Sequence, residues 1–184
     1  MFPWQLDPDT QLRPLSTADA GTFHALVVAN RRHLDRFLRW SATVKTLGDA
    51  RTFLEGFTAR LTAGDGWHLG IWVNGALAGG LVCWYINRYS RNAELGYWLA
   101  ESYVGRGLVT RAAARGIEHL FQIEGLHRIE MLCGVENHAS RRVAERLGFQ
   151  FEGIRRQSAW ITDHFADHAV YGLLRPEWKP LPSP

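Results

Sequence analysis

The spacing of apolar residues predicts a succession of strands and helices from the N-terminus onward. A short strand over Gln11 to Leu15 precedes a helix that begins near Ser16 and extends to Asn30. The proline in this strand favours an edge position, because proline cannot donate to a neighbouring strand. Residues 31–43 are rich in arginine and aromatic residues, typical of a second short helix or of a loop over a site. A further helix is predicted from Gly48 to Ala63, with its apolar residues on one face.

The middle of the chain shows an antiparallel meander followed by a glycine turn and a helix. Strands over Trp67 to Val73 and Leu77 to Ile86 flank Asn74-Gly75, a strong hairpin signal. A turn then leads into a third strand around Glu94. Gly105-Arg106-Gly107 interrupts the pattern, and apolar residues recur at helical spacing from Leu108 until Gly125, which suits a helix C-terminus.

The last third of the chain adds strands and one short helix. We expect a buried strand parallel to the Glu94 strand, a helix and two final strands, over Arg128 to Val135, Asn137 to Leu147, Phe149 to Ile161 and Asp167 to Leu174. The order predicts one α/β domain over residues 1–184, with a surface tail from about residue 176. The expected sheet is mixed and mostly antiparallel, with six or seven strands and helices on both faces.

Composition and charge narrow the function classes. The 184 residues are enough to bury a core without disulfides, and the net charge of +3 is too small to indicate a nucleic-acid partner. Cys83 and Cys133 lack metal-site or disulfide-framework spacing, so we expect free thiols and no metal. The N-terminus has no signal-peptide pattern, and no apolar run approaches membrane-spanning length, so a cytoplasmic protein without membrane contact is expected.

The glycine turn is the first candidate site. A helix N-terminus presents unpaired N–H groups and a partial positive charge, and glycines let the backbone approach an anion closely. Arg106 adds a full charge, and the Thr110 hydroxyl is within reach of a phosphate oxygen. A tight strand-to-helix connection without a ligand explains the same residues, so the turn alone does not decide between the two.

Three sequence blocks, in this order and spacing, resemble the GNAT superfamily of acetyl-CoA-dependent N-acetyltransferases. They are E-L-G-Y-W-L from Glu94, V-G-R-G-L-V-T from Val104, and V-E-N-H-A-S-R-R-V-A-E-R-L-G-F from Val135. Within the superfamily, the chain resembles the branch that acetylates ribosomal-protein N-termini at alanine or serine. The resemblance covers the chain from about Leu12 to Trp178, and it implies the GNAT fold and acetyl-CoA as co-substrate.

The resemblance also implies which residues hold acetyl-CoA. The pyrophosphate loop of the family usually has the pattern Q/R-x-x-G-x-G/A; here Gly107 is kept, while Val104 and Val109 replace the first and last positions. Because such a loop binds through backbone N–H groups, these departures do not exclude binding. The implied cofactor-binding residues are Trp98, Leu99 and Ala100 along the pantetheine arm, Val104, Gly105, Arg106, Gly107, Leu108, Val109 and Thr110 in the loop, and Asn137 and Ser140.

Glu94 and Ser140 are the candidate catalytic residues. Acyl transfer to an amine requires a neutral amine, a stabilised oxyanion and a proton for the departing thiolate. Glu94 lies among apolar residues that would raise its pKa, and Ser140 matches the hydroxyl that the family places near the thioester sulfur. Two structural alternatives stay open: Glu94 in an ion pair with an arginine, and Asn137 as a helix cap with Ser140 solvated beside it.

The family pattern leaves the general base and the acceptor pocket unassigned. The ribosomal-protein branch places a proposed glutamate base at the position of Ala159, so Glu94 acting through water, Asp163 or His164 would have to substitute. His33, Trp40, Trp84 and Trp160 are candidates for substrate binding, with core packing as the competing explanation for the aromatic residues. His127, His138, His164 and His168 show no metal pattern and are expected in loops or on the surface.

The expected function is transfer of an acetyl group from acetyl-CoA to a primary amine in a ternary complex. A protein N-terminal amine, such as that of a ribosomal protein, is the favoured acceptor, and a homodimer is possible from the resemblance. The alternatives are a small-molecule amine acetyltransferase and a non-catalytic acyl-CoA-binding regulatory domain. A dinucleotide-binding fold fits poorly, because Thr110 stands at the third glycine position and the turn follows an antiparallel meander. A P-loop is excluded because G-K-S/T is absent.

Overall fold

The computed structural model describes residues 2–181 and contains one mixed sheet in the order β1-β2-β3-β4-β5-β6-β8-β7. Neighbouring strands are antiparallel except β5 and β6, which are parallel. The strands are β1 (Trp4–Asp7), β2 (Thr10–Pro14), β3 (Trp67–Val73), β4 (Ala76–Asn87), β5 (Asn92–Leu99), β6 (Arg128–Gly134), β7 (Gln150–Ile161) and β8 (His164–Leu174). The predicted α/β architecture is confirmed, with eight strands where six or seven were expected.

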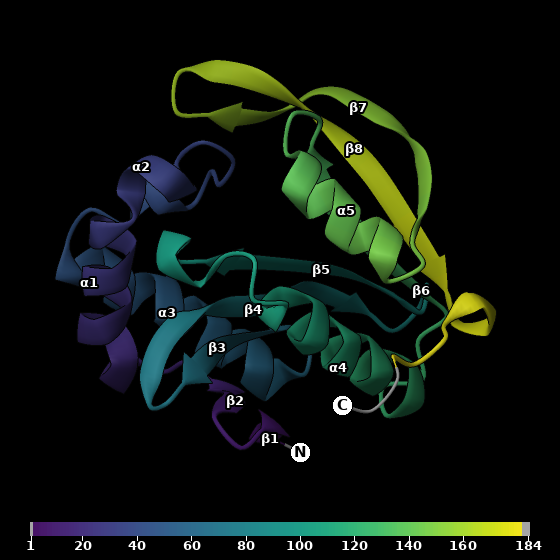
Figure 1. Cartoon of the computed structure of the whole chain (residues 1–184), viewed down its shortest axis with the longest axis horizontal. Coiled ribbons are helices and arrows are strands. Elements are labelled where there is room, and N and C mark those ends of the chain that lie inside the picture. The colour runs from purple at the N-terminus through teal and green to yellow at the C-terminus, as the bar shows by residue number, and fades with distance from the viewer. Residues whose placement is uncertain (1, 182–184) are drawn as a thin grey trace.

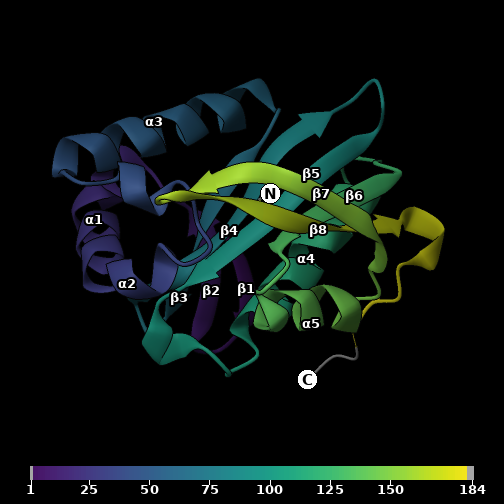
Figure 2. The same cartoon turned by 90° about the horizontal axis from the view of Figure 1, so that it is seen from above.

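Helices cover both faces of the sheet, as predicted (Figures 1 and 2). One face is covered by α1 (Ala20–Ala29) and α3 (Leu47–Ala63), and the other by α4 (Leu108–Gln122) and α5 (His138–Arg146). The short helix α2 (Arg31–Leu34) follows α1 directly. Four 3-10 turns complete the fold: η1 (Thr17–Asp19), η2 (Ser41–Thr43), η3 (Glu101–Tyr103) and η4 (Arg175–Glu177).

The prediction that the first strand lies at an edge is wrong. β2 pairs with β1 on one side and with β3 on the other, so the edge position belongs to β1. Pro14 is tolerated because it is the last residue of β2, where the missing N–H interrupts no continuing ladder. Trp4-Gln5-Leu6-Asp7 alternates apolar and polar residues, which is a short strand signal that the prediction overlooked.

Local signals explain why the elements begin and end where they do. Thr46 caps α3 by accepting from the N–H of Asp49 at 3.1 Å, and the Asp49 carboxylate accepts from the N–H of Thr46 at 2.8 Å. Asn74 and Gly75 both have positive φ, 49° and 77°, as a two-residue hairpin turn requires. These features match the predicted hairpin and helix boundaries closely.

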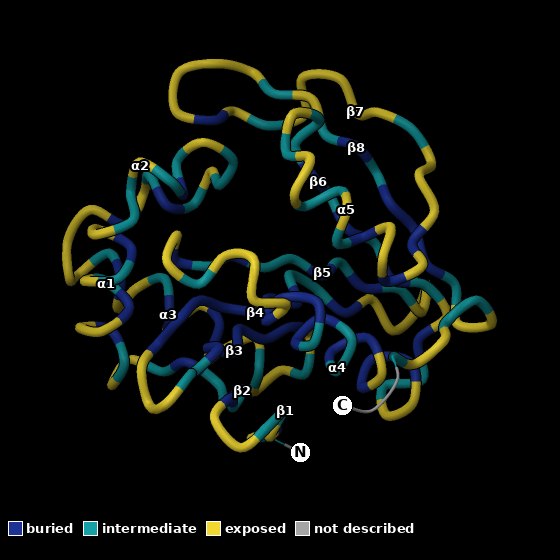
Figure 3. The backbone as a smooth tube through the Cα atoms, in the orientation of Figure 1, coloured by how far each residue is buried: buried dark blue, intermediate teal, exposed yellow. Residues whose placement is uncertain are grey.

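Two apolar cores lie on either side of the sheet, and the strands between them form the most buried part of the chain (Figure 3). The larger core lies beneath α4 and α5, and the smaller one lies beneath α1 and α3. The prediction of a surface tail from about residue 176 is partly wrong, because Trp178 and Leu181 pack against the larger core. Residues 182–184 of that tail lie outside the described residues.

Candidate active site

The site begins where the parallel strands β5 and β6 separate. Their pairing extends from Asn92 and Arg128 to Glu94 and Glu130, and in the described residues it goes no further. Beyond that point the C-terminal half of each strand diverges from the other. The sheet therefore has an opening at its centre, lined by backbone groups of β5 and β6 that lack a partner strand.

Alternation along β5 and β6 gives this opening two chemically different sides. Leu95 and Met131 belong to the core beneath α4 and α5, whereas Trp98 belongs to the core beneath α1 and α3. Because successive side chains of a strand point to opposite faces, Glu94 and Glu130 face the side of α1 and α3. The opening thus connects an acidic side with the side that the glycine turn and α5 occupy.

A hydrogen-bonded chain of Tyr97, Ser140 and Cys133 lies on the α5 side. The Tyr97 hydroxyl is 2.8 Å from Ser140 Oγ, and Ser140 Oγ donates to Cys133 Sγ at 3.2 Å. Burial raises the pKa of Tyr97 and of the Cys133 thiol, so both stay protonated at neutral pH. The Ser140 hydroxyl is therefore held in place by two neutral groups, and its single hydrogen points to Cys133; donation to an incoming sulfur requires the hydroxyl to rotate away from Cys133.

Asn137 has the cap role that the sequence left open. Its side chain accepts from the N–H of Ser140 at 3.1 Å, which fixes the first turn of α5. The cap orients Ser140 toward β5 and β6 and away from solvent. Ser140 itself is only half-exposed and bonded to Tyr97, so it is not the solvated residue of the structural alternative.

The glycine turn has the backbone geometry of an anion site. Gly105 and Gly107 have φ of 83° and 71°, a left-handed conformation that other residues rarely adopt. Gly107 is the N-cap of the 15-residue helix α4, so the first-turn N–H groups of α4 point toward the loop. Arg106 donates to the carbonyl of Ser102 at 2.8 Å, and Thr110 Oγ1 accepts from Arg146. The side chains of Arg106 and Thr110, which were expected to bind phosphate, are thus already engaged in contacts within the protein.

The backbone N–H and C=O groups at the end of β5 point alternately toward β4 and toward the opening. Ala100 donates its N–H to the carbonyl of Ala78 at 2.9 Å. Because N–H and C=O groups alternate sides along a strand, those of Leu99 and Tyr97 point toward the opening. Among the residues expected to pair with the pantetheine arm, Leu99 has the right orientation, whereas Trp98 and Ala100 face β4.

Glu94 lies on the side of the opening that faces α1 and α3, without a close ionic partner. Its side chain forms no hydrogen bond or ion pair with another described residue, so the simple ion-pair alternative is not what the structure shows. Burial raises the pKa of Glu94; Arg155 and Arg39 oppose this shift, and Glu130 reinforces it. Glu130 itself is paired with Arg128 at 2.9 Å. A carboxyl group with a raised pKa beside the opening suits a general base.

Two segments far apart in sequence cover the side of the opening on which Glu94 lies. The turn after α2 places Phe37 against the end of β6, where a Cβ on Gly134 would lie 3.4 Å from the Phe37 ring. The tip of the β7–β8 hairpin meets the same turn, since Thr162 donates to the carbonyl of Asp35 at 3.3 Å. Figure 1 shows the hairpin extending over the sheet toward α2.

The four candidate substrate residues lie in different environments. Trp40 stacks on Phe23 and Phe53, and Trp84 packs against Phe57, so both contribute to the core beneath α1 and α3. Trp160 is half-exposed at the hairpin tip, in contact with Phe165. His33 is half-buried on α2. Core packing explains Trp40 and Trp84 without a ligand, while Trp160 and His33 lie on the covering segments.

Sequence reasoning missed several residues that the fold brings to the opening. Tyr97 and Cys133 lie at inward positions of β5 and β6, a placement that strand alternation alone could have indicated. His168, expected on the surface, is half-buried in β8 and lies 3.0 Å from Ser158 through Nδ1. Burial lowers the pKa of His168, and Arg39 and Arg155 lower it further, which keeps the ring neutral near pH 7.

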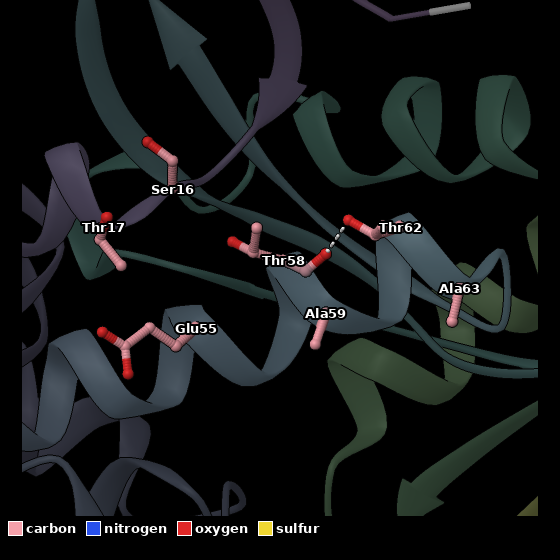
Figure 4. Close-up of a pocket in the computed structure, with 7 residues that line it drawn as sticks. All are labelled: Ser16, Thr17, Glu55, Thr58, Ala59, Thr62 and Ala63. Carbon is pink, nitrogen blue, oxygen red and sulfur yellow. Dashed lines mark hydrogen bonds between the residues drawn. The ribbon is translucent and has the colours of Figure 1, made fainter.

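Other features of the described residues lie apart from the opening. A hollow of about 590 Å³ between η1 and α3 is lined by small and hydroxyl side chains, with Glu55 at its edge (Figure 4). It is on the outer surface of α3 and receives none of the residues discussed above.

Residues 2–181 contain no group of three or more potential metal ligands. Within the same residues, every helix is too short or too polar to cross a bilayer.

Comparison with known proteins identifies this arrangement. Residues 10–150 match the family model of the acetyltransferase (GNAT) domain. The ribosomal-protein-serine acetyltransferase of Escherichia coli is 30% identical over 151 residues, covering 82% of this chain and 84% of that protein. YdaF of Bacillus subtilis is 28% identical over 180 residues, covering 97% of this chain and 98% of that protein.

A solved structure agrees with both sequence matches. RimL, a ribosomal L7/L12 α-N-protein acetyltransferase in complex with coenzyme A, superimposes with a TM-score of 0.90 at 25% identity, covering 94% of this chain and 98% of that one. The predicted resemblance is confirmed. The chain belongs to the GNAT acetyltransferase family and is an acetyl-CoA-dependent N-acetyltransferase that transfers acetyl to an amine.

Proposed function

We propose that this enzyme acetylates the N-terminal amine of a protein, with a ribosomal protein as the favoured acceptor. The observation that supports this is the two-sided opening between β5 and β6. Its α5 side offers the Tyr97–Ser140 pair to a sulfur atom, and its other side offers Glu94 beneath the two covering segments. The similarity to ribosomal-protein acetyltransferases supports the choice of acceptor, and such acceptors imply a cytoplasmic reaction.

The proposed reaction is direct attack in a ternary complex. Glu94 accepts a proton from the ammonium group, directly or through water, and the amine nitrogen then attacks the thioester carbonyl carbon. The N–H of Leu99, which points into the opening, stabilises the developing oxyanion. The C–S bond breaks as the nitrogen loses its second proton to solvent. The departing thiolate accepts a hydrogen bond from Ser140 and takes up a proton from solvent, so that Ser140 keeps its own. The first-turn N–H groups of α4 hold the pyrophosphate.

Labelled acetyl-CoA and a ribosomal fraction test this proposal. We expect mass spectrometry to locate the label on the α-amine of one or a few proteins. Ser140→Ala tests the role of the serine in the same assay. The turnover of this variant should be lower by about tenfold or more, while its coenzyme A affinity stays within about twofold. Label only on lysine side chains or on small amines would contradict the proposed acceptor. Unchanged turnover in Ser140→Ala would remove Ser140 from the mechanism.

Replacing Glu94 by glutamine should lower activity and raise stability together. We expect kcat/KM to fall by about a hundredfold, because general-base catalysis contributes about 10² to 10⁴. The acid limb of the pH–rate profile caused by protonation of Glu94 should disappear, leaving the limb of the amine itself. Initial rates from about pH 5 to about pH 9 provide this measurement, since an unperturbed α-amine titrates within that interval, at about pH 7.8.

The stability effect of the same change follows from the sign of the shift. The pKa of Glu94 is higher in the folded state, so its contribution to stability is full below the unfolded pKa and is lost as pH rises through the folded value. Glu94→Gln removes this loss, and the melting temperature at pH 8 should increase. Glu118→Gln, on the exposed side of α4, is the control for both readouts. A lower melting temperature with normal kinetics would show that Glu94 has only a structural role.

A further inference from the structure

Exposed arginines surround the acceptor side of the opening. Arg36 and Arg39 lie on the turn after α2, and Arg155 lies on β7. Arg36 and Arg39 form no ion pair with any other described residue, and Arg155 reaches Glu130 only at 3.8 Å. We call these three side chains the arginine rim. Their charge is therefore largely available to a bound partner.

The arginine rim lies at the entrance to the site. Phe37, between Arg36 and Arg39, packs on the end of β6, and Arg36 lies over the Phe37 ring with 5.2 Å between the guanidinium carbon and the ring centroid. Arg39 and Arg155 are close enough to Glu94 to influence its ionisation. The rim thus spans both covering segments.

Acidic residues near the rim are already engaged. Asp35 accepts from the Ser41 hydroxyl at 2.6 Å, and Asp167 accepts from the N–H of Gln157 at 2.7 Å. Asp163 lies 2.9 Å from His164 Nδ1. Each of these carboxylates already accepts from, or lies beside, a neighbouring group of this chain, whereas Arg36 and Arg39 have no ionic partner among the described residues. The guanidinium groups are therefore the charged groups whose donors are free for the carboxylates of a bound molecule.

Charge changes sign between the rim and the interior. Glu94 and Glu130 lie on the inner surface, where an ammonium group would be attracted, and the arginines lie outside them. We propose that the preferred acceptor is a polypeptide whose N-terminal ammonium group is followed, within its first several residues, by acidic side chains. This inference rests on the proposed function. A nucleic acid would match the rim but offers no ammonium group for the inner carboxylates.

The geometry of an extended chain is compatible with this proposal. Each residue advances about 3.3 Å, so side chains three to five positions along lie about 10 to 16 Å from the amine. Complementary charge at such an entrance raises encounter rates and selects among partners more than it strengthens a single contact.

Three matched peptides test the proposal on the full-length enzyme. Each begins with a free serine and has glutamate, glutamine or lysine at positions four to six, that is three to five residues beyond the serine. We expect kcat/KM to decrease in that order, by about tenfold or more across the series at low salt, and the difference to shrink in 0.5 M salt, where the Debye length is only about 4 Å. Arg36→Glu/Arg39→Glu should reverse the order while leaving KM for acetyl-CoA unchanged. Arg175→Glu, exposed at the opposite end of β8, should preserve it.

The outcomes separate this inference from the proposed function. If no peptide is acetylated at its N-terminus, the proposed function fails. If all three are acetylated within about twofold of each other, or lysine is preferred, only the acidic-acceptor inference is overturned. Competition by a single-stranded RNA, together with indifference to peptide charge, would reassign the rim to nucleic acid. If the double variant folds poorly, the effect of salt on the kcat/KM differences among the three peptides, measured with the wild-type enzyme, still tests the inference.

Discussion

Gly107→Glu is expected to weaken coenzyme A binding by about a hundredfold or more, equivalent to about 2.7 kcal/mol. The φ of 71° at Gly107 strains any other L-residue, and the new carboxylate would lie at the start of α4, where the pyrophosphate is proposed to bind. Like charges in a partly desolvated loop repel strongly. Calorimetric titration with coenzyme A measures the affinity, and a thermal melt confirms that the variant is folded.

Gly125→Glu is the matched control for this effect. Gly125 also has a positive φ, 66°, and lies at the opposite end of α4, where a Cβ would meet no atom within 4 Å. It therefore introduces the same charge and similar backbone strain at a distance from the loop. Equal weakening in both variants would indicate a general loss of structure, and normal affinity in Gly107→Glu would disprove the pyrophosphate assignment.

Acidification should destabilise the protein through His68. His68 is buried beneath α1 and α3, where its Nε2 accepts from Trp98 Nε1 at 3.1 Å and its Nδ1 has no partner in the described residues. Burial lowers the pKa of His68 to about 3. The folded pKa of His68 is below its unfolded value of about 6.5. The contribution of His68 to the free energy of unfolding is therefore fully present above pH 6.5. It declines as pH falls toward 3, by at most about 1.4 kcal/mol per pH unit.

His68→Gln isolates this contribution, since glutamine offers an acceptor to Trp98 and does not titrate. Urea unfolding of both proteins at pH 8, 6 and 5 should show a smaller loss of unfolding free energy in the variant, by about 2 kcal/mol at pH 5. Any packing cost of the substitution appears equally at pH 8 and cancels in the comparison. Parallel pH dependence of the two proteins would show that another group accounts for acid unfolding.

Gly80 shows how closely the His68–Trp98 pair is packed. A Cβ at Gly80 would lie 2.5 Å from His68 Nε2 and would also overlap the Trp98 indole. The hydrogen bond between the two rings therefore depends on a glycine in the adjacent strand β4. Nothing in the sequence near Gly80 indicated this requirement, because the three residues come from three different strands.

Most of the local structure followed from short-range patterns. Asn74-Gly75 and the glycines that flank α4 are decided by backbone preferences within a few residues, and the structure confirms both. The Thr46–Asp49 box obeys the same short-range rule but was not predicted. Such signals fail where pairing is non-local. β1 was missed because its alternation spans only four residues and its strand conformation depends on pairing with β2, and β8 starts earlier than expected because β7 pairs with it across a bulge.

The candidate site divides in the same way. The sequence by itself determined the family, the glycine turn and the positions of Glu94, Asn137 and Ser140, since these belong to contiguous blocks. Only the tertiary structure decided that β5 and β6 separate after Glu94, that Tyr97 and Cys133 hold Ser140, and that Arg39 and Arg155 approach Glu94. The physical reason is that these contacts join residues that are distant along the chain, and their energies depend on burial and orientation, which residue order alone does not specify.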